Sequence, residues 1–189
     1  VMLAAPHHPR KLDPHTFAIW MRLMRHCGET RLWLLADNRA VENNLRSAAL
    51  AQGVDSSRLI FTGRIDFESY HDMLAQADLF LDTPLYNGGA TVCDAIAAGL
   101  PVLTQMGDSV PQRMAASILS AADFTEGIAQ SADSYEQKAL AWLSDRSLLA
   151  GLKQKILDAR GKAPFYRLNE WVFEFEQVLQ NTWERSSGS

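Results

Sequence analysis

Short apolar runs alternate with amphipathic stretches along the first two thirds of the chain. The apolar runs predict buried strands, and the stretches whose apolar residues recur at i, i+3 and i+4 predict helices. Strands and helices alternate at least four times, which indicates a parallel sheet covered by helices on both faces, with right-handed crossovers. The expected fold is therefore α/β, a Rossmann-like doubly wound parallel sheet. Its predicted strands are residues 1–5, 32–36, 59–61, 77–81 and 101–104.

Capping residues and glycines mark the boundaries of the helices in this region. Asp13 can cap a helix that has Pro14 in its first turn, and Gly28 ends that helix. Its apolar stripe is typical of a helix that faces a core. The other helices predicted in the first two thirds are residues 41–52, 67–76, 91–98 and 110–120.

The last third of the chain has a different pattern. No strand signal follows Asp123, and helices are predicted at 134–143, 146–159 and about 165–185. We therefore expect a core over residues 1–125, a helical extension of the same domain over 126–185, and a flexible tail at 186–189. The last helix carries apolar residues on more than one side, which is typical of a helix with two surfaces to cover.

The stretch from residue 77 to 104, ADLFLDTPLYNGGATVCDAIAAGLPVLT, is predicted as strand, glycine-bearing loop, helix and strand. Such a loop brings a helix N-terminus to the carboxyl end of a strand, where free N–H groups and the helix dipole favour an anion. Gly88 and Gly89 would let the backbone approach a ligand, and Thr91 and Asp94 share one helix face. The pattern fits a clamp for the phosphate and ribose of a nucleotide. A pair of glycines before a helix is also ordinary punctuation, and the spacing alone leaves both interpretations open.

Composition and charge narrow the class of protein. The 189 residues carry a net charge of −4 without a basic block, so nothing favours nucleic acid or an acidic membrane surface as a partner. No apolar run approaches the ~18 residues of a membrane span. Cys27 and Cys93 lie among apolar residues, which suits reduced thiols and a cytoplasmic protein. The five histidines show no ligand spacing with cysteines or carboxylates, so we expect neither a metal site nor a cofactor.

The stretch at 77–104 resembles the signature of the O-linked N-acetylglucosamine transferase family, including its bacterial members and the SPINDLY-type fucosyltransferases. The resemblance implies the C-terminal, donor-binding half of a bacterial glycosyltransferase of the two-lobed GT-B kind, and 189 residues are too few for both lobes. The likeness continues through RKLDP at 10–14, LWLLA at 32–36, RLIF at 58–61 and MGDSVPQRMAAS at 106–117.

The resemblance implies roles for residues at matching positions. Lys11 aligns with the lysine that the family uses on the donor diphosphate, and it is the catalytic residue expected here. Asp94 aligns with the acidic residue that binds the ribose hydroxyls. The amides of Gly89 and Ala90 and the hydroxyl of Thr91 would hold the diphosphate. Without the resemblance, an isolated lysine or a helix aspartate would be read as a solvated surface charge.

Several positions depart from the family pattern. Members commonly carry His-Thr-Thr or a run of threonines where this chain has Gly89, Ala90 and a single threonine, so two side-chain donors are absent. The asparagine and glutamine usual upstream of the lysine are replaced by His7 and His8. Tyr70 occupies a position near the base and could stack on it, although a core or surface aromatic is an equally good interpretation.

By resemblance, the full enzyme would transfer a sugar from a UDP-sugar, UDP-N-acetylglucosamine above all, to a Ser or Thr hydroxyl with inversion. The protein acceptor would bind through an N-terminal lobe or helical repeats outside this chain, so the domain alone should be inactive. Phe173 and Trp183 are expected to contact that lobe and to be exposed here. Two groups of alternatives stay open: the same half-fold with another chemistry (asparagine glucosyltransferase, GDP-fucose transferase or sugar-nucleotide epimerase), or a degenerate, non-catalytic interaction domain.

Overall fold

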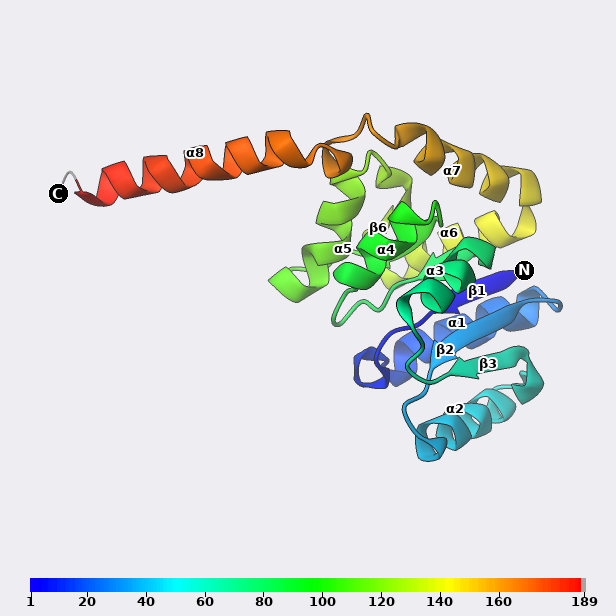
Figure 1. The fold of residues 1–189 in the computed structure, drawn as a ribbon. Helices are drawn as coiled ribbons and strands as arrows, with labels where there is room; N and C mark the ends of the chain where they lie inside the picture. Colours follow the sequence, from blue (N-terminus) through cyan, green and yellow to red (C-terminus); the bar gives the residue numbers. More distant parts are fainter. Residues whose placement is uncertain (188–189) are drawn as a thin grey trace.

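A computed structural model describes residues 1–187 and places a six-stranded parallel sheet at the centre of the fold (Figure 1). The strand order is β3-β2-β1-β4-β5-β6, and every neighbouring pair is parallel. This order confirms the doubly wound arrangement predicted from the alternation of strands and helices. The strands are β1 (Met2–Ala5), β2 (Arg31–Leu35), β3 (Leu59–Thr62), β4 (Leu79–Leu81), β5 (Val102–Gln105) and β6 (Ile128–Ala129).

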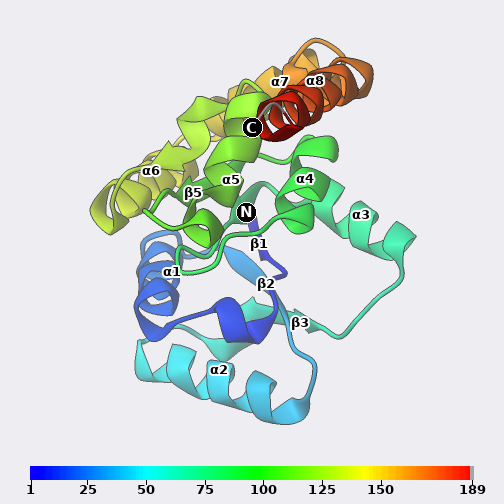
Figure 2. The ribbon, with the colours of Figure 1, turned by 90° about the vertical axis from the view of Figure 1, so that its left-hand side faces the viewer.

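Helices lie on both faces of the sheet, and Figure 2 shows α1 and α2 on the opposite side of the strands from α3. Helix α1 contacts α6 on its face, while α3, α4 and α5 contact one another in series on the other. The helices are α1 (Pro14–His26), α2 (Arg39–Ala51), α3 (Phe67–Gln76), α4 (Ala90–Ala97), α5 (Val110–Ala121), α6 (Ala132–Ser144), α7 (Arg146–Ala159) and α8 (Leu168–Ser187).

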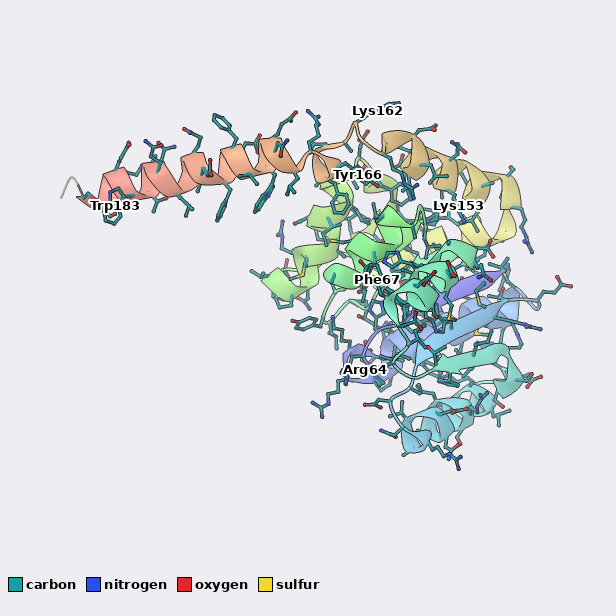
Figure 3. All side chains as sticks on the ribbon, in the orientation of Figure 1. Arg64, Phe67, Lys153, Lys162, Tyr166 and Trp183 are labelled. Atoms are coloured by element: carbon teal, nitrogen blue, oxygen red, sulfur yellow. The ribbon has the colours of Figure 1, made fainter. Side chains whose placement is uncertain are left out.

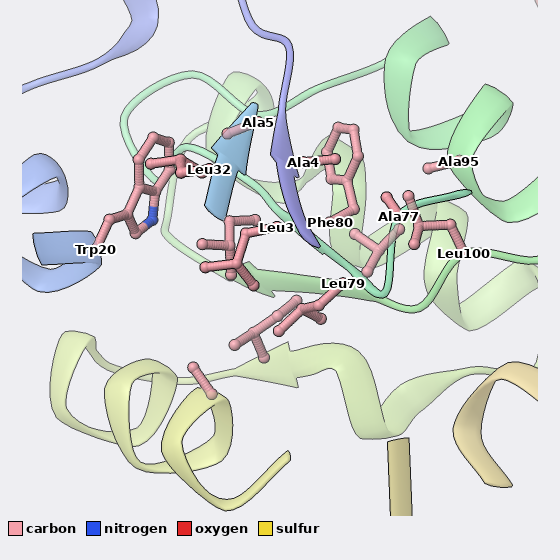
Figure 4. Packing of buried hydrophobic residues seen from close by; sticks show 14 of the residues in the cluster. Leu3, Ala4, Ala5, Trp20, Leu32, Ala77, Leu79, Phe80, Ala95 and Leu100 are labelled. Carbon is pink, nitrogen blue, oxygen red and sulfur yellow. The ribbon is translucent and has the colours of Figure 1, made fainter. Parts of the chain in front are cut away.

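The core lies between the sheet and these helices. Side chains of the central strands, such as Leu3, Leu79 and Phe80, are fully buried. Figure 4 shows Trp20 of α1 on one side of these strands and Phe80 on the other side, toward Ala95 of α4. Because both faces are covered, the central strands read as continuous apolar runs, which made them recognisable in the sequence.

Strand β6 corrects the expectation that no strand follows Asp123. It has two residues, pairs with the end of β5, and follows a short 3-10 turn, η3 (Thr125–Gly127). Gly127 is required there because a Cβ would lie 2.1 Å from the carbonyl oxygen of Val102. Two residues are too few to show an apolar period, so the pattern could not reveal this strand.

The last helix leaves the body of the domain and extends as a single straight rod (Figure 1). None of its residues is buried. Phe173 is 62% exposed and Trp183 is 72% exposed, as predicted from the sequence. Figure 3 shows Trp183 near the far end of the helix. The helix includes residues 186–187 of the predicted tail, whereas 188–189 lie outside the described residues.

Candidate functional site

The strand order reverses between β1 and β4, so the loops after these two strands leave the sheet in opposite directions. In open α/β sheets a crevice forms at that point, beyond the carboxyl ends of the strands. The loop after β1 contains a 3-10 turn, η1 (Pro9–Lys11), and the loop after β4 leads to Gly89, which caps α4. The topology therefore brings two of the stretches singled out in the sequence to one place.

Lys11 reaches across this crevice to the loop after β4. Its Nζ donates a hydrogen bond to the carbonyl oxygen of Asn87 at 3.0 Å and lies 4.3 Å from the centre of the Tyr86 ring. Partial burial lowers the pKa of Lys11, and the negative charge of Asp82 opposes that change. The structure thus brings Lys11 and the glycine loop together although they are 76 residues apart.

The N-terminus of α4 offers several hydrogen-bond donors without partners. The backbone amides of Gly89, Ala90 and Thr91 have no acceptor within residues 1–187. The hydroxyl oxygen of Thr91 is buried and also lacks a partner among the described residues. Unpaired N–H groups and the positive end of the helix dipole attract an anion. This end of α4 is the part of the crevice best suited to a phosphate group.

The two glycines of the loop have a structural reason that the sequence did not indicate. A Cβ on Gly88 would lie 2.5 Å from the Thr91 Oγ1 atom and 2.8 Å from a methyl carbon of Val92. A Cβ on Gly89 would lie 2.8 Å from the sulfur of Met114 on α5. The missing side chains therefore let the loop pack against α4 and α5. The ligand-approach role that the sequence suggested for them stays a prediction.

Asp82 is a residue of this site that the sequence analysis did not single out. It follows β4 directly and is fully buried. One carboxylate oxygen accepts the amide hydrogen of Gly88 at 2.7 Å, and the other accepts the hydroxyl of Thr104 at 2.6 Å. Burial raises the pKa of Asp82 to about 7, and these hydrogen bonds oppose the change. The position of Asp82 directly after an apolar run is the cue that the sequence offers, and ordinary loops begin in the same way.

His7 lies beside this carboxylate, near the start of the loop after β1. Its Nε2 is 3.6 Å from a carboxylate oxygen of Asp82 and donates to the carbonyl oxygen of Leu81 at 3.0 Å. Burial lowers the pKa of His7 to about 4, so the ring is neutral near pH 7. His8, by contrast, is exposed and accepts the amide hydrogen of Arg10 as the cap of η1. The two histidines that replace the asparagine and glutamine usual in the family therefore have different environments.

Tyr70 and Asp94 lie near each other at the contact between α3 and α4. Burial raises the pKa of Tyr70, and the charge of Asp94 raises it further. The Tyr70 ring is 5.9 Å from the Trp33 ring, and its hydroxyl is buried without a partner among the described residues. Tyr70 also lines a cavity of about 220 Å³ together with Arg64 and Ile65 of the loop after β3. Figure 3 shows Arg64 on this loop and Phe67 at the start of α3.

Comparison with known proteins identifies the family of this chain. The profile of glycosyl transferase family 41 matches residues 7–175, which is most of the chain. The chain belongs to this family. It is 29% identical over 175 residues to a UDP-N-acetylglucosamine–peptide N-acetylglucosaminyltransferase of Caenorhabditis elegans. It is 30% identical over 174 residues to a probable enzyme of that name, SEC, of Arabidopsis thaliana. The matches cover 93% and 92% of this chain.

The fold of this family 41 chain has a solved counterpart. The structure of a mutant of the Thermobaculum terrenum O-GlcNAc transferase superposes on the whole chain with a TM-score of 0.92, at 21% identity. The chain has the fold of the C-terminal, Rossmann-like domain of a GT-B glycosyltransferase. It spans 37% of that solved chain, and 15% and 18% of the worm and plant relatives.

No cluster of three or more His, Cys, Asp or Glu side chains that could hold a metal ion occurs in residues 1–187. Within the same range, no helix is long and apolar enough to cross a lipid bilayer.

Proposed function

We propose that this chain is the donor-binding half of an inverting protein O-glycosyltransferase that takes its sugar from a UDP-sugar, most specifically UDP-N-acetylglucosamine, and transfers it to a Ser or Thr hydroxyl. The observation that carries the proposal is the crevice between β1 and β4, where Lys11 lies against a loop whose next three amides are unpaired. Family membership supports the reaction class, and the names of the worm and plant relatives support the donor and the peptide acceptor.

The diphosphate of the donor would bind at the N-terminus of α4. The amides of Gly89, Ala90 and Thr91 and the Thr91 hydroxyl would donate to its oxygens, and Lys11 would turn from Asn87 to the same group. A unit charge ~4 Å from a phosphate oxygen is worth about 4 kcal/mol at an effective dielectric of ~20. The helix end adds ~1 kcal/mol.

These groups would stabilise the negative charge that develops on the departing nucleoside diphosphate, without a metal ion. The amides would be in place before the donor binds and Lys11 would turn to the diphosphate on binding, so little reorganisation would be needed when the glycosidic bond breaks. Lys11 is the residue to which we assign this catalytic role, because its ammonium is the full positive charge that reaches the loop.

The nucleoside would lie between α3 and the end of α4. Asp94 can accept two hydrogen bonds from a ribose diol. The neighbouring cavity lined by Tyr70, Arg64 and Ile65 would receive the base against the wall that Tyr70 forms. Because Tyr70 is largely buried against Trp33, we assign it to the wall of this pocket, with the edge of its ring available to the base.

The acceptor would bind outside this chain. Helix α8 exposes large apolar side chains, including Phe173 and Trp183, and two of its rings, Trp171 and Phe175, stack at 5.2 Å. Exposed apolar surface of this extent is typical of an interface. We assign it to the other lobe of a two-lobed enzyme, in keeping with the 37% of the solved neighbour that this chain spans.

Calorimetric titration with UDP, with GDP as the comparison and no metal added, tests the proposal. We expect micromolar to millimolar binding of UDP, weaker binding of GDP, and a loss of at least tenfold in Lys11→Ala and Asp94→Ala. Lys162→Ala, after the end of α7, and Asp158→Asn, on α7, are matched controls that should bind UDP like the unchanged chain. Equal binding of UDP and GDP would contradict the assignment of the donor, and unchanged binding in both site variants would favour a degenerate interaction domain.

A further inference from the structure

The Asp82 carboxylate is a group at this site to which the proposed function gives no role. It is fully buried beneath the loop that precedes α4 and cannot reach a ligand itself. Its two oxygens are held by the Gly88 amide and the Thr104 hydroxyl, so its orientation is fixed from both sides. A charge-assisted hydrogen bond to a backbone amide is among the stronger contacts a loop can have.

The direction of that hydrogen bond matters for the amides that follow. The Gly88 N–H points inward to Asp82, whereas the amides of Gly89, Ala90 and Thr91 remain unpaired. The hydrogen bond of Gly88 to Asp82 therefore marks the point in the loop after which the backbone amides are unpaired. Without the Asp82 carboxylate, the buried Gly88 N–H would have no acceptor. The loop would then adopt other conformations in which this N–H is hydrogen-bonded.

We propose that Asp82 is a positioning residue for the diphosphate loop: by holding the Gly88 amide inward, it keeps the next three amides of the chain oriented toward the donor. The inference rests on the proposed function, because it assigns those amides to the diphosphate. A loop that is competent only part of the time binds its ligand more weakly in proportion to the competent fraction.

The negative charge of Asp82 acts in the opposite sense. A buried carboxylate near an anion site repels the anion, so removal of its charge would tighten anion binding. The charged and titratable groups around it are Lys11 and His7 from the loop after β1 and Tyr135 from α6. The effect of the charge and the effect of the hydrogen bond can therefore be separated by their signs.

Two neutral variants make this separation. Asp82→Asn removes the charge and keeps an oxygen that can accept the Gly88 amide, whereas Asp82→Ala removes both. We expect Asp82→Asn to bind UDP as tightly as the unchanged chain or more tightly, measured at pH 8. We expect Asp82→Ala to bind about tenfold more weakly than Asp82→Asn. Equal affinities of the two variants would overturn the proposal, because the charge alone would then explain the role of Asp82.

A second readout does not require the ligand. Hydrogen exchange of the Gly88 amide, followed by NMR, should be slow in the unchanged chain and in Asp82→Asn, and fast in Asp82→Ala. If the unchanged chain does not bind UDP, the proposed function fails, and this exchange pattern alone decides whether Asp82 holds the loop. Slow exchange in Asp82→Ala would overturn the inference whatever the chain binds.

Thr104→Val provides a further test of the role of Asp82 if the Asp82→Ala variant does not fold. This variant retains the carboxylate but removes the hydroxyl that orients its second oxygen. We expect UDP binding two- to fivefold weaker and faster exchange at Gly88. Unchanged affinity and unchanged exchange in Thr104→Val would contradict the claim that a fixed carboxylate sets the loop.

Discussion

Replacement of Gly88 by alanine tests the packing of the loop directly. The new Cβ would lie 2.5 Å from the Thr91 Oγ1 atom, 2.8 Å from a methyl carbon of Val92 and 3.3 Å from a carboxylate oxygen of Asp82. Two of these distances are well below van der Waals contact, so the loop must move or the side chains must rotate. Overpacking of this kind costs about 1–3 kcal/mol. A domain of this size loses roughly 2–4 °C of melting temperature for each kcal/mol.

Thermal unfolding of the Gly88→Ala variant should therefore show a melting temperature roughly 2–12 °C below that of the unchanged chain, with weaker UDP binding. Gly151→Ala is the matched control, because nothing lies within 4 Å of the added Cβ and the residue is inside α7. Alanine is favoured over glycine in a helix by ~1 kcal/mol, so this control should raise the melting temperature. A Gly88→Ala variant as stable as the unchanged chain would refute the packing argument.

Three further predictions concern the core and the last helix. The folded state raises the pKa of Asp82 to about 7 and lowers that of His7 to about 4. Through Asp82 the domain therefore loses stability as pH rises from 4 to 7, and through His7 it loses stability as pH falls from 6.5 to 4. Urea unfolding of the unchanged chain should thus show little net pH dependence of stability between pH 4 and 6.5. Stability should rise with pH in Asp82→Asn and fall with pH in His7→Gln. The same pH dependence in both variants would contradict these opposite effects of Asp82 and His7. Tyr135→Phe should cost about 1–3 kcal/mol, because two buried partners lose their hydrogen bond; an unchanged melting temperature would show that they find other partners. Phe173→Ser and Trp183→Ser should shift the melting temperature of this chain by less than 2 °C, because both side chains are exposed. The same variants should destabilise a protein that includes the other lobe. A larger shift in this chain alone would indicate that the two side chains belong to its own core.

The sequence predicted the five longer strands because each is an apolar run bounded by turn residues. Their boundaries agree to within two residues, as do those of the helices α1 to α5. Asp13 and Pro14 mark the start of α1 as expected: the Asp13 side chain accepts the amides of His15 and Thr16. Signals of this kind act over a few residues and can be read without the fold. Strand β6 could not be read in this way, because its pairing with β5 depends on the close approach at Gly127.

The site was predictable where topology determines it and not where side-chain packing does. Lys11 and the glycine loop each follow a strand, and parallel strands deliver such loops to one edge of the sheet. The role of Asp82 depends on contacts with Gly88 and Thr104, and the latter is 22 residues away. Its position after an apolar run looks like the start of any loop. Burial of a charged residue is a tertiary property, and local pattern gives no measure of it.

The loop before α4 is supported from the far side of the sheet as well as from beneath. The Tyr135 hydroxyl on α6 donates to the backbone carbonyl of Asp82 at 3.2 Å and accepts the indole N–H of Trp20 on α1 at the same distance. Backbone and side chain of Asp82 are thus held by different elements, and both rings are fully buried. A backbone fixed at this residue leaves the loop few ways to relax. The entropy of ordering the anion site is therefore lost when the domain folds, so a diphosphate that binds there meets amides already in place.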